Sequence, residues 1–188
     1  MKEAMKAFAI ISLLTAALYV GAAIFHRWQG GAGPRGKTAR HTILPESISA
    51  MVYDLPRPWQ WVWTVWLMAV TFTVASSLIE AMPDAWRFVA FLTVAALGFV
   101  AAMPLVRHGR NTGHYVCAIA AAVLSQVCVL LTAPCWLLLW TAFPAVLAAM
   151  YCFPRATACL NGRGVFLLEV LCAATVYAAL IYHFSFAV

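Results

Sequence analysis

Residues 44–63, LPESISAMVYDLPRPWQWVW, decide how the rest of the chain is organised. This is the only long stretch outside the apolar runs that mixes apolar side chains with acids and hydroxyls. Pro56 and Pro58 interrupt it, because proline lacks a backbone N–H and resists continuing a helix. Tryptophans then cluster, and tryptophan prefers the headgroup level of a bilayer, where its ring is half hydrated. They are Trp59, Trp61, Trp63 and Trp66. We therefore expect an interfacial amphipathic segment over residues 43–55, followed by a transmembrane helix from about Trp59.

The composition excludes a soluble domain. Of 188 residues, 65% are hydrophobic and only 10% are charged, whereas soluble globular chains are roughly 45–50% apolar and about 25% charged. A membrane-spanning helix needs about 20 mostly apolar residues, so the chain has room for about six spans. We predict an all-α membrane protein, a six-transmembrane-helix bundle that forms one domain over residues 1–188. The expected spans are residues 5–25, 59–79, 86–106, 114–131, 135–153 and 165–182.

The first apolar run could be mistaken for a secretory signal peptide. Its length of about 20 residues exceeds the apolar region of such peptides, and no clear small-x-small cleavage site follows it. We expect a retained helix. The fifth apolar run contains Pro144, which predicts a kink.

Basic residues are unevenly divided between the two sides of the predicted bundle. Of the 12 lysines and arginines, nine lie in the first, third and fifth loops and three lie on the other side. The positive-inside rule then places the odd loops in the cytoplasm and both termini outside. Lys2 and Lys6, beside the first span, favour the opposite orientation. The expected location is a bacterial inner (plasma) membrane.

Charge and cysteine usage argue against several other classes of protein. The net charge of +6 is spread over the loops and forms no basic patch, so we expect no nucleic-acid partner. The six cysteines show no CxxC spacing, which argues against a zinc knuckle or a disulfide framework. Only His114, of five histidines, falls near other candidate ligands, and no HxxxH or HExxH motif occurs. We therefore expect no metal, no cofactor and no catalytic residues.

The candidate ligand-binding site collects polar residues that six spans would place in one leaflet. Glu169 is the most informative, because an ionisable group at mid-membrane costs about 2.5–3.5 kcal/mol on insertion and usually faces protein or a cavity. His114 and Arg107 are its candidate cationic neighbours, and a carboxylate that reaches back to the interface is the alternative. The candidate residues are Ser47, Ser49, Asp54, Arg107, His114 and Glu169.

Two further patterns concern helix faces. A stripe on the fourth span recurs at helical spacing and suits either close packing or a hydrated cavity. It consists of His114, Cys117, Ala121, Ser125 and Cys128. A ladder of small residues on the second span lets another helix approach closely. It consists of Ala69, Thr73, Ser77 and Ala81.

The arrangement of these motifs resembles the six-helix FRAG/DRAM-like membrane proteins and their uncharacterised bacterial relatives. The matching positions are Pro45, Ser47, Ile48 and Ser49, then Pro104, then His114 with Ala118. The resemblance implies a compact six-helix bundle whose first loop and third turn converge on one side. It implies no settled chemistry, since members are linked to lipid-anchor remodelling and membrane trafficking or have no assigned role. Two features depart from the family: the residues after Ser49, and the usual orientation, which places the first loop outside.

The sequence favours a protein that binds or transports a lipid-like or small amphiphilic ligand in a polar cavity open to one leaflet. Its expected partners are membrane lipids. One alternative is an oligomeric pore or effector subunit, a homo-oligomer assembled through the small-residue faces of the second and third spans. Another is an intramembrane hydrolase, which no GxSxG-like motif supports. Its residues would be Ser47 or Ser49, His114, and Asp54 or Glu169. A structural bundle without a site is the last alternative.

Overall fold

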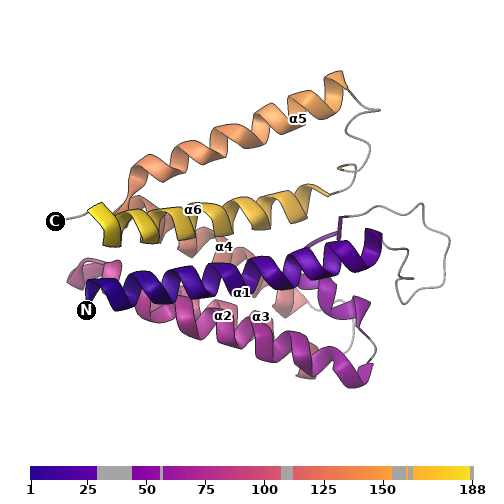
Figure 1. The fold of residues 1–188 in the computed structure, drawn as a ribbon, viewed down its shortest axis with the longest axis horizontal. Coiled ribbons are helices and arrows are strands. Elements are labelled where there is room, and N and C mark those ends of the chain that lie inside the picture. Colours follow the sequence, from indigo (N-terminus) through magenta and orange to yellow (C-terminus); the bar gives the residue numbers. More distant parts are fainter. Residues whose placement is uncertain (29–43, 56, 107–111, 154–159, 161–162, 187–188) are drawn as a thin grey trace.

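The computed structural model describes residues 1–28, 44–55, 57–106, 112–153, 160 and 163–186, and Figure 1 shows their arrangement. Within these ranges every regular element is a helix. The α-helices are α1 (Lys2–Trp28), α2 (Gln60–Ala81), α3 (Arg87–Val106), α4 (Thr112–Thr132), α5 (Ala142–Cys152) and α6 (Gly164–Phe186). The 3-10 helices are η1 (Ser49–Asp54), η2 (Arg57–Trp59), η3 (Asp84–Trp86) and η4 (Pro134–Thr141). The predicted all-α class is confirmed.

Six helical segments are long and apolar enough to cross a membrane, which is the architecture of a multi-pass membrane protein. They are Lys2–Phe25, Gln60–Ala81, Asp84–Ala102, Thr112–Thr132, Pro134–Cys152 and Gly164–Phe186. Each corresponds to a predicted span, because long apolar runs are the strongest signal in such a sequence. The 22 residues of α2 give a length of about 33 Å at about 1.5 Å per residue. That length matches a hydrocarbon core of about 30 Å.

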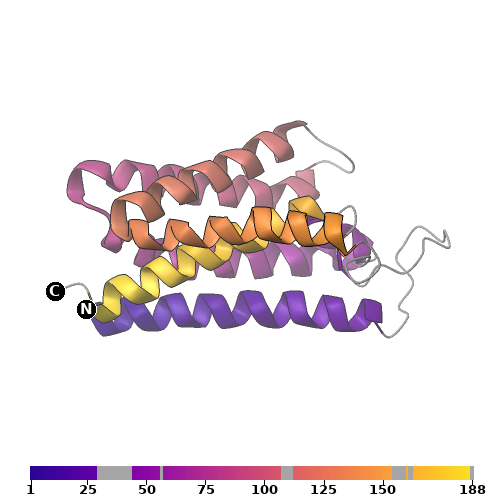
Figure 2. The ribbon, with the colours of Figure 1, turned by 90° about the horizontal axis from the view of Figure 1, so that it is seen from above.

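Five of the helices form a closed ring. α1 packs on α2, α2 on α3, α3 on α4, α4 on α6, and α6 on α1 again. Figures 1 and 2 show both chain termini at one end of this ring. We call that end the terminal end, and the opposite end, which carries η1, the loop end.

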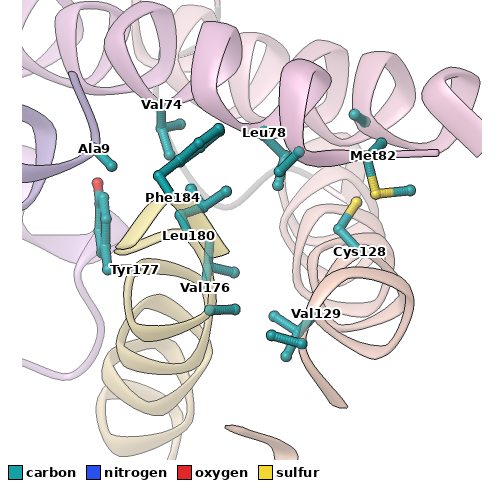
Figure 3. Close-up of a cluster of buried hydrophobic side chains, with 14 of the residues drawn as sticks. Ala9, Val74, Leu78, Met82, Cys128, Val129, Val176, Tyr177, Leu180 and Phe184 are labelled. Atoms are coloured by element: carbon teal, nitrogen blue, oxygen red, sulfur yellow. The ribbon is translucent and has the colours of Figure 1, made fainter. Parts of the chain in front are cut away.

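The main apolar core lies toward the terminal end. Figure 3 shows side chains from α1, α2, α4 and α6 meeting there. Leu180 and Val129 are at most 1% exposed, and Phe184 closes the cluster near the end of α6. A smaller buried cluster at the loop end consists of Met51, Val52, Trp63 and Val100.

The fifth span lies outside the ring. It begins as the 3-10 helix η4 and becomes α-helical at Ala142, two residues before Pro144. Proline lacks the N–H that would bond the carbonyl of Trp140, and its ring clashes with that carbonyl, so the α-helix does not extend back through Trp140, and Pro144 lies in the first turn of α5. The structure shows a change of helix type here, and the predicted kink stays a prediction. No residue of α5 is buried, and Figure 1 shows α5 as the outermost helix.

The tryptophan cluster divides between the outer surface and the interior of the bundle. Trp59 and Trp61 are 57% and 52% exposed, as expected of an interfacial belt. Trp63 is fully buried and Trp66 is partly buried, so these two side chains face the inside of the bundle, and the headgroup depth of the cluster stays a prediction. Their spacing explains the difference, since positions 63, 66 and 70 share the face of α2 that turns into the ring.

The segment predicted over residues 43–55 occurs at the loop end as the turn that leads into η1, with residue 43 outside the described ranges. Met51 and Val52 are at most 1% exposed and pack with Trp63 and Val100. The apolar side of the segment thus faces the bundle's own interior. η1 covers one end of the helix ring.

Candidate functional site

Glu169 connects the last helix to the first loop. The backbone N–H of Ile48 donates a hydrogen bond to Glu169 Oε2. The Ser49 hydroxyl donates to Glu169 Oε1 over 3.3 Å, and the Ser47 and Ser49 hydroxyl oxygens lie 3.1 Å apart. Residues separated by 121 positions in the chain therefore meet at the loop end.

The geometry of η1 explains why a carboxyl group is needed here. Ile48 occupies the N-cap position of η1. The first N–H groups of any helix have no partner inside that helix, and the membrane core offers no water to satisfy them. A carboxyl group accepts hydrogen bonds through both oxygens. Glu169 thus caps η1 from another helix.

A narrow cavity of about 210 Å³ begins beside this cap and runs along the inside of the helix ring. All five ring helices contribute to its wall, together with Ile48 and Ser49. Along α2 the wall extends from Trp63 to Leu78, a distance of about 22 Å at about 1.5 Å per residue. The wall is mainly apolar, and so differs from the polar cavity expected from the sequence.

Small side chains on α4 leave this space open. The α4 residues in the wall are Ala118, Ala121, Ala122 and Ser125. None of them is long enough to reach the opposite helices, so the centre of the ring is not filled. Of the predicted stripe on α4, all members except Cys117 are buried, and Cys117 is partly buried. The stripe is confirmed as an inward-facing surface.

The predicted site residues separate into two groups. Ser47, Ser49 and Glu169 lie together, as predicted for one leaflet. His114 is buried, with 8% exposure, yet it is not part of the cavity wall and makes no hydrogen bond to Glu169 in the described part of the chain. The side chain of Asp54 and all of Arg107 lie outside the described residues.

The hydrolase alternative requires a serine–histidine hydrogen bond. Among the described residues, the Ser49 hydroxyl contacts Glu169 and Ser47, and Nδ1 of His114 is buried without a hydrogen-bond partner. Ser49 and His114 therefore do not form the start of a catalytic triad here.

Two side chains in the cavity wall bury polar atoms that have no partner among the described residues. The indole N–H of Trp63 and the hydroxyl of Thr71 are both buried and make no hydrogen bond within the described ranges, and both residues line the cavity. Trp66 also lines the cavity, but its indole N–H donates to the carbonyl of Thr15 over 3.1 Å. Sequence reasoning missed this difference, because it depends on which carbonyl each indole reaches.

A second polar cluster centres on Gln126, a residue that the sequence did not single out. Its side-chain oxygen accepts hydrogen bonds from the Trp140 indole and the Thr175 hydroxyl, each over 2.9 Å. Its side-chain nitrogen donates to the Ser125 hydroxyl over 3.2 Å and to the Cys172 carbonyl over 3.3 Å. Gln126 thereby fastens η4 to α4 and α6.

In the part of the chain that the structure describes, no group of three or more His, Cys, Asp and Glu side chains could hold a metal ion. Compared with known proteins, the chain matches no family model, no curated protein and no solved structure. Met51 and Val52 of η1 form one buried cluster with Trp63 and Val100, and Cys117 and Ala118 of α4 pack against that cluster. The family resemblance stays a prediction.

Proposed function

We propose that this protein binds a lipid-like amphiphile, with one apolar chain inside the helix ring and the polar end at the Ser47–Ser49–Glu169 cluster. The observation that carries the proposal is a long apolar cavity with this polar cluster at one end. An amphiphile is likewise apolar along its chain and polar at one end. The ligand would be drawn from the surrounding membrane lipids, and transport across the bilayer would be an extension of the same binding step.

The size of the cavity favours a single chain. Its volume of about 210 Å³ exceeds the apolar cavity of about 150 Å³ that admits benzene. It is smaller than the range of about 300–1,000 Å³ typical of pockets for drug-sized molecules. A small volume spread over the length of the wall favours one narrow chain over a fused ring system or a two-chain lipid.

Glu169 keeps capacity for a ligand. A carboxyl group offers about four acceptor positions, and the backbone N–H of Ile48, the hydroxyl of Ser49 and the backbone N–H of Ser49 occupy three of them. The remaining position suits a head that donates a hydrogen bond. Hydroxyl or ammonium groups meet that requirement.

We also infer that the protein resides in the inner (plasma) membrane of a bacterium. Its spans are helices, whereas proteins of bacterial outer membranes are β-barrels. The orientation of the loop end in that membrane is a separate question.

Direct binding tests the proposal. Purified protein in lipid nanodiscs would be titrated with tritiated hexadecylglycerol, a single-chain ether with hydroxyl groups, and empty nanodiscs would supply the background. We expect saturable binding at one molecule per chain. Ala121, in the cavity wall, is buried, so Ala121→Phe fills the space and should abolish binding.

The matched control is Ala69→Phe, because Ala69 is exposed on α2 and is not part of the cavity wall. This variant should bind as the unmodified protein does. Overfilling a packed interior costs about 1–3 kcal/mol, so circular dichroism and thermal unfolding would verify that Ala121→Phe is folded. Undiminished binding by a folded Ala121→Phe protein would contradict the proposal.

A homo-oligomer is the second candidate, and the exposed fifth span favours it. No residue of α5 is buried, and nothing lies within 4 Å of a Cβ built on Gly98. The ladder on α2 is less available, since Ser77 and Ala81 are buried and the Ser77 hydroxyl bonds the carbonyl of Met5 over 2.7 Å. Mass photometry in nanodiscs would decide, and a closed ring of copies around a central opening would favour the pore.

A further inference from the structure

Trp63 carries an unused hydrogen-bond donor at the head of the cavity. Its side chain is completely buried, with 0% accessible surface, and its indole N–H has no partner in the described part of the chain. An indole N–H is a donor only. A buried donor without a partner costs about 1–3 kcal/mol, and such a group in a native structure calls for an explanation.

The Thr71 hydroxyl, also without a partner, does not point to a ligand in the same way. A threonine hydroxyl in a helix can rotate to the carbonyl three or four residues back, as Thr73 does to the carbonyl of Ala69 over 2.8 Å. Trp63 has no such local solution, because its N–H is fixed in the plane of a ring packed against Met51 and Val52. The indole of Trp63 is therefore the more informative group.

The surroundings select the chemistry of an acceptor. The described residues of the cavity wall include one ionisable acid, Glu169, and neither lysine nor arginine. An anionic phosphate or carboxylate placed here would meet a carboxyl group and no cation. A neutral oxygen acceptor would satisfy the indole without introducing charge.

The depth of Trp63 within the bundle indicates which part of the ligand carries the acceptor. Trp63 lies three residues after the start of α2 and Glu169 five residues after the start of α6, about 4.5 and 7.5 Å along their helices at about 1.5 Å per residue. Both therefore lie at the level where an amphiphile's head joins its chain. In an acyl ester this junction is a carbonyl.

We propose that the ligand is a neutral single-chain acyl ester with free hydroxyl groups, of the monoacylglycerol class. Its ester carbonyl accepts the hydrogen bond of the Trp63 indole, and one of its hydroxyls donates to the free acceptor position of Glu169. This inference rests on the proposed function and specifies the ligand of the same cavity.

Two ligands that differ only at the carbonyl test it. Monopalmitoylglycerol and hexadecylglycerol share a glycerol head and a saturated chain, but only the first carries a carbonyl. In competition against tritiated hexadecylglycerol on the unmodified protein in nanodiscs, we expect the ester to bind about tenfold more tightly, a difference of about 1.4 kcal/mol. Palmitate, an anion, should bind more weakly than either.

Paired tryptophan variants assign the effect to one donor. Trp63→Phe should remove the preference for the ester, lowering its affinity about tenfold more than that of the ether. Trp66→Phe is the control, because that indole is already bonded to Thr15, and it should keep the preference for the ester. The comparison of ester with ether on the unmodified protein stands even if a variant fails to fold.

Each other outcome has a definite meaning. Saturable binding of ester and ether with equal affinity would overturn the inference and leave the proposed function intact, with water then satisfying the indole. Tighter binding of palmitate than of the glycerol ester would overturn the charge argument and with it the ligand class. Absence of saturable binding by either glycerol lipid would overturn the proposed function itself.

Discussion

The two ends of the helix ring differ in how far their buried polar groups are satisfied. Toward the terminal end, Gln126 uses both donors and both acceptor positions of its amide, and the Ser12 hydroxyl links Val70 and Tyr177. The indole N–H of Trp136 is the buried polar atom without a partner beside the core there, whereas toward the loop end Trp63, Thr64 and His114 each bury such an atom in the described ranges. The interior is filled by 15 buried residues at the first end and by four at the second.

This difference assigns structural support to the terminal end and ligand binding to the loop end. A satisfied network and a full core fix the positions of helices, because moving any of them breaks several contacts at once. Empty volume and unused donors lower stability unless something else occupies them. The terminal end therefore acts as the scaffold, and the loop end holds the groups that a ligand would complete.

Removing Gln126 should have the largest effect on stability. Gln126→Leu deletes four hydrogen bonds across three helical segments. Hydrogen bonds between membrane helices average about 0.6 kcal/mol each, so we expect the free energy of unfolding in bicelles to fall by about 2 kcal/mol. Gln60→Leu is the control, because Gln60 makes one long contact of 3.5 Å to the Leu55 carbonyl. Equal losses in the two variants would contradict the scaffold role.

Removing the cap of η1 should have a more local effect. Glu169→Leu leaves the Ile48 N–H and the Ser49 hydroxyl without their acceptor, at a cost of about 1–3 kcal/mol. Hydrogen exchange at Ile48–Leu55 should accelerate about tenfold or more, while amides of α4 near Gln126 keep their protection. Glu169→Gln keeps one carbonyl acceptor and should give an intermediate rate. Uniform acceleration over the whole bundle would show that the cap is not a local device.

A single bond in the scaffold should matter less. The Ser12 hydroxyl donates to the Val70 carbonyl over 3.0 Å, so its 2.7 Å contact with Tyr177 uses the tyrosine proton. Tyr177→Phe removes that donor and should lower the free energy of unfolding by about 0.6 kcal/mol. The variant would be measured beside Tyr151→Phe, whose side chain is 88% exposed and should be neutral. A loss above that of Gln126→Leu would reverse the order expected of the two clusters.

The smallest effect should come from Trp63, and with the opposite sign. Trp63→Phe removes an unpaired donor, so the ligand-free protein should be unchanged or slightly more stable, by less than about 1 kcal/mol after the smaller ring is allowed for. Trp66→Phe breaks a bond to Thr15 and separates a ring stacked on Tyr19 at 4.2 Å, so it should lose stability. Unfolding of both variants, with bound lipid removed, would be compared. Equal losses would mean that the Trp63 indole is satisfied.

The sequence predicted the scaffold better than the site. The length of the apolar runs was enough to predict all six spans, and the i, i+3, i+7 spacing was enough to predict that Ala121 and Ser125 face inward. The prediction that Ser49 and Glu169 share a leaflet agrees with their hydrogen bond. The prediction that His114 is the cationic neighbour of Glu169 is wrong, and Arg107, the other candidate, lies outside the described residues. The partner that Glu169 does have, a backbone N–H, exists at every non-proline residue and leaves no mark in the sequence.

The difference in burial between neighbouring tryptophans could not be predicted from the sequence either. Trp61 and Trp63 lie two residues apart on one helix, yet Trp61 is exposed whereas Trp63 is buried and lines the cavity. Tryptophan suits both environments, so residue type alone does not separate them. The cavity volume depends on how several small side chains meet across the ring, which is a property of the assembled fold.

The bond between Ile48 and Glu169 has a consequence for the order in which the protein is made. A ribosome completes η1 long before it reaches α6, and α6 is also the helix that closes the ring between α1 and α4. Until Gly164–Phe186 has entered the membrane, η1 has no cap and the cavity lacks one of its five walls. A nascent chain that stops short of α6 therefore presents an open apolar trough to the bilayer, and capacity to bind would arise only when the final span is in place.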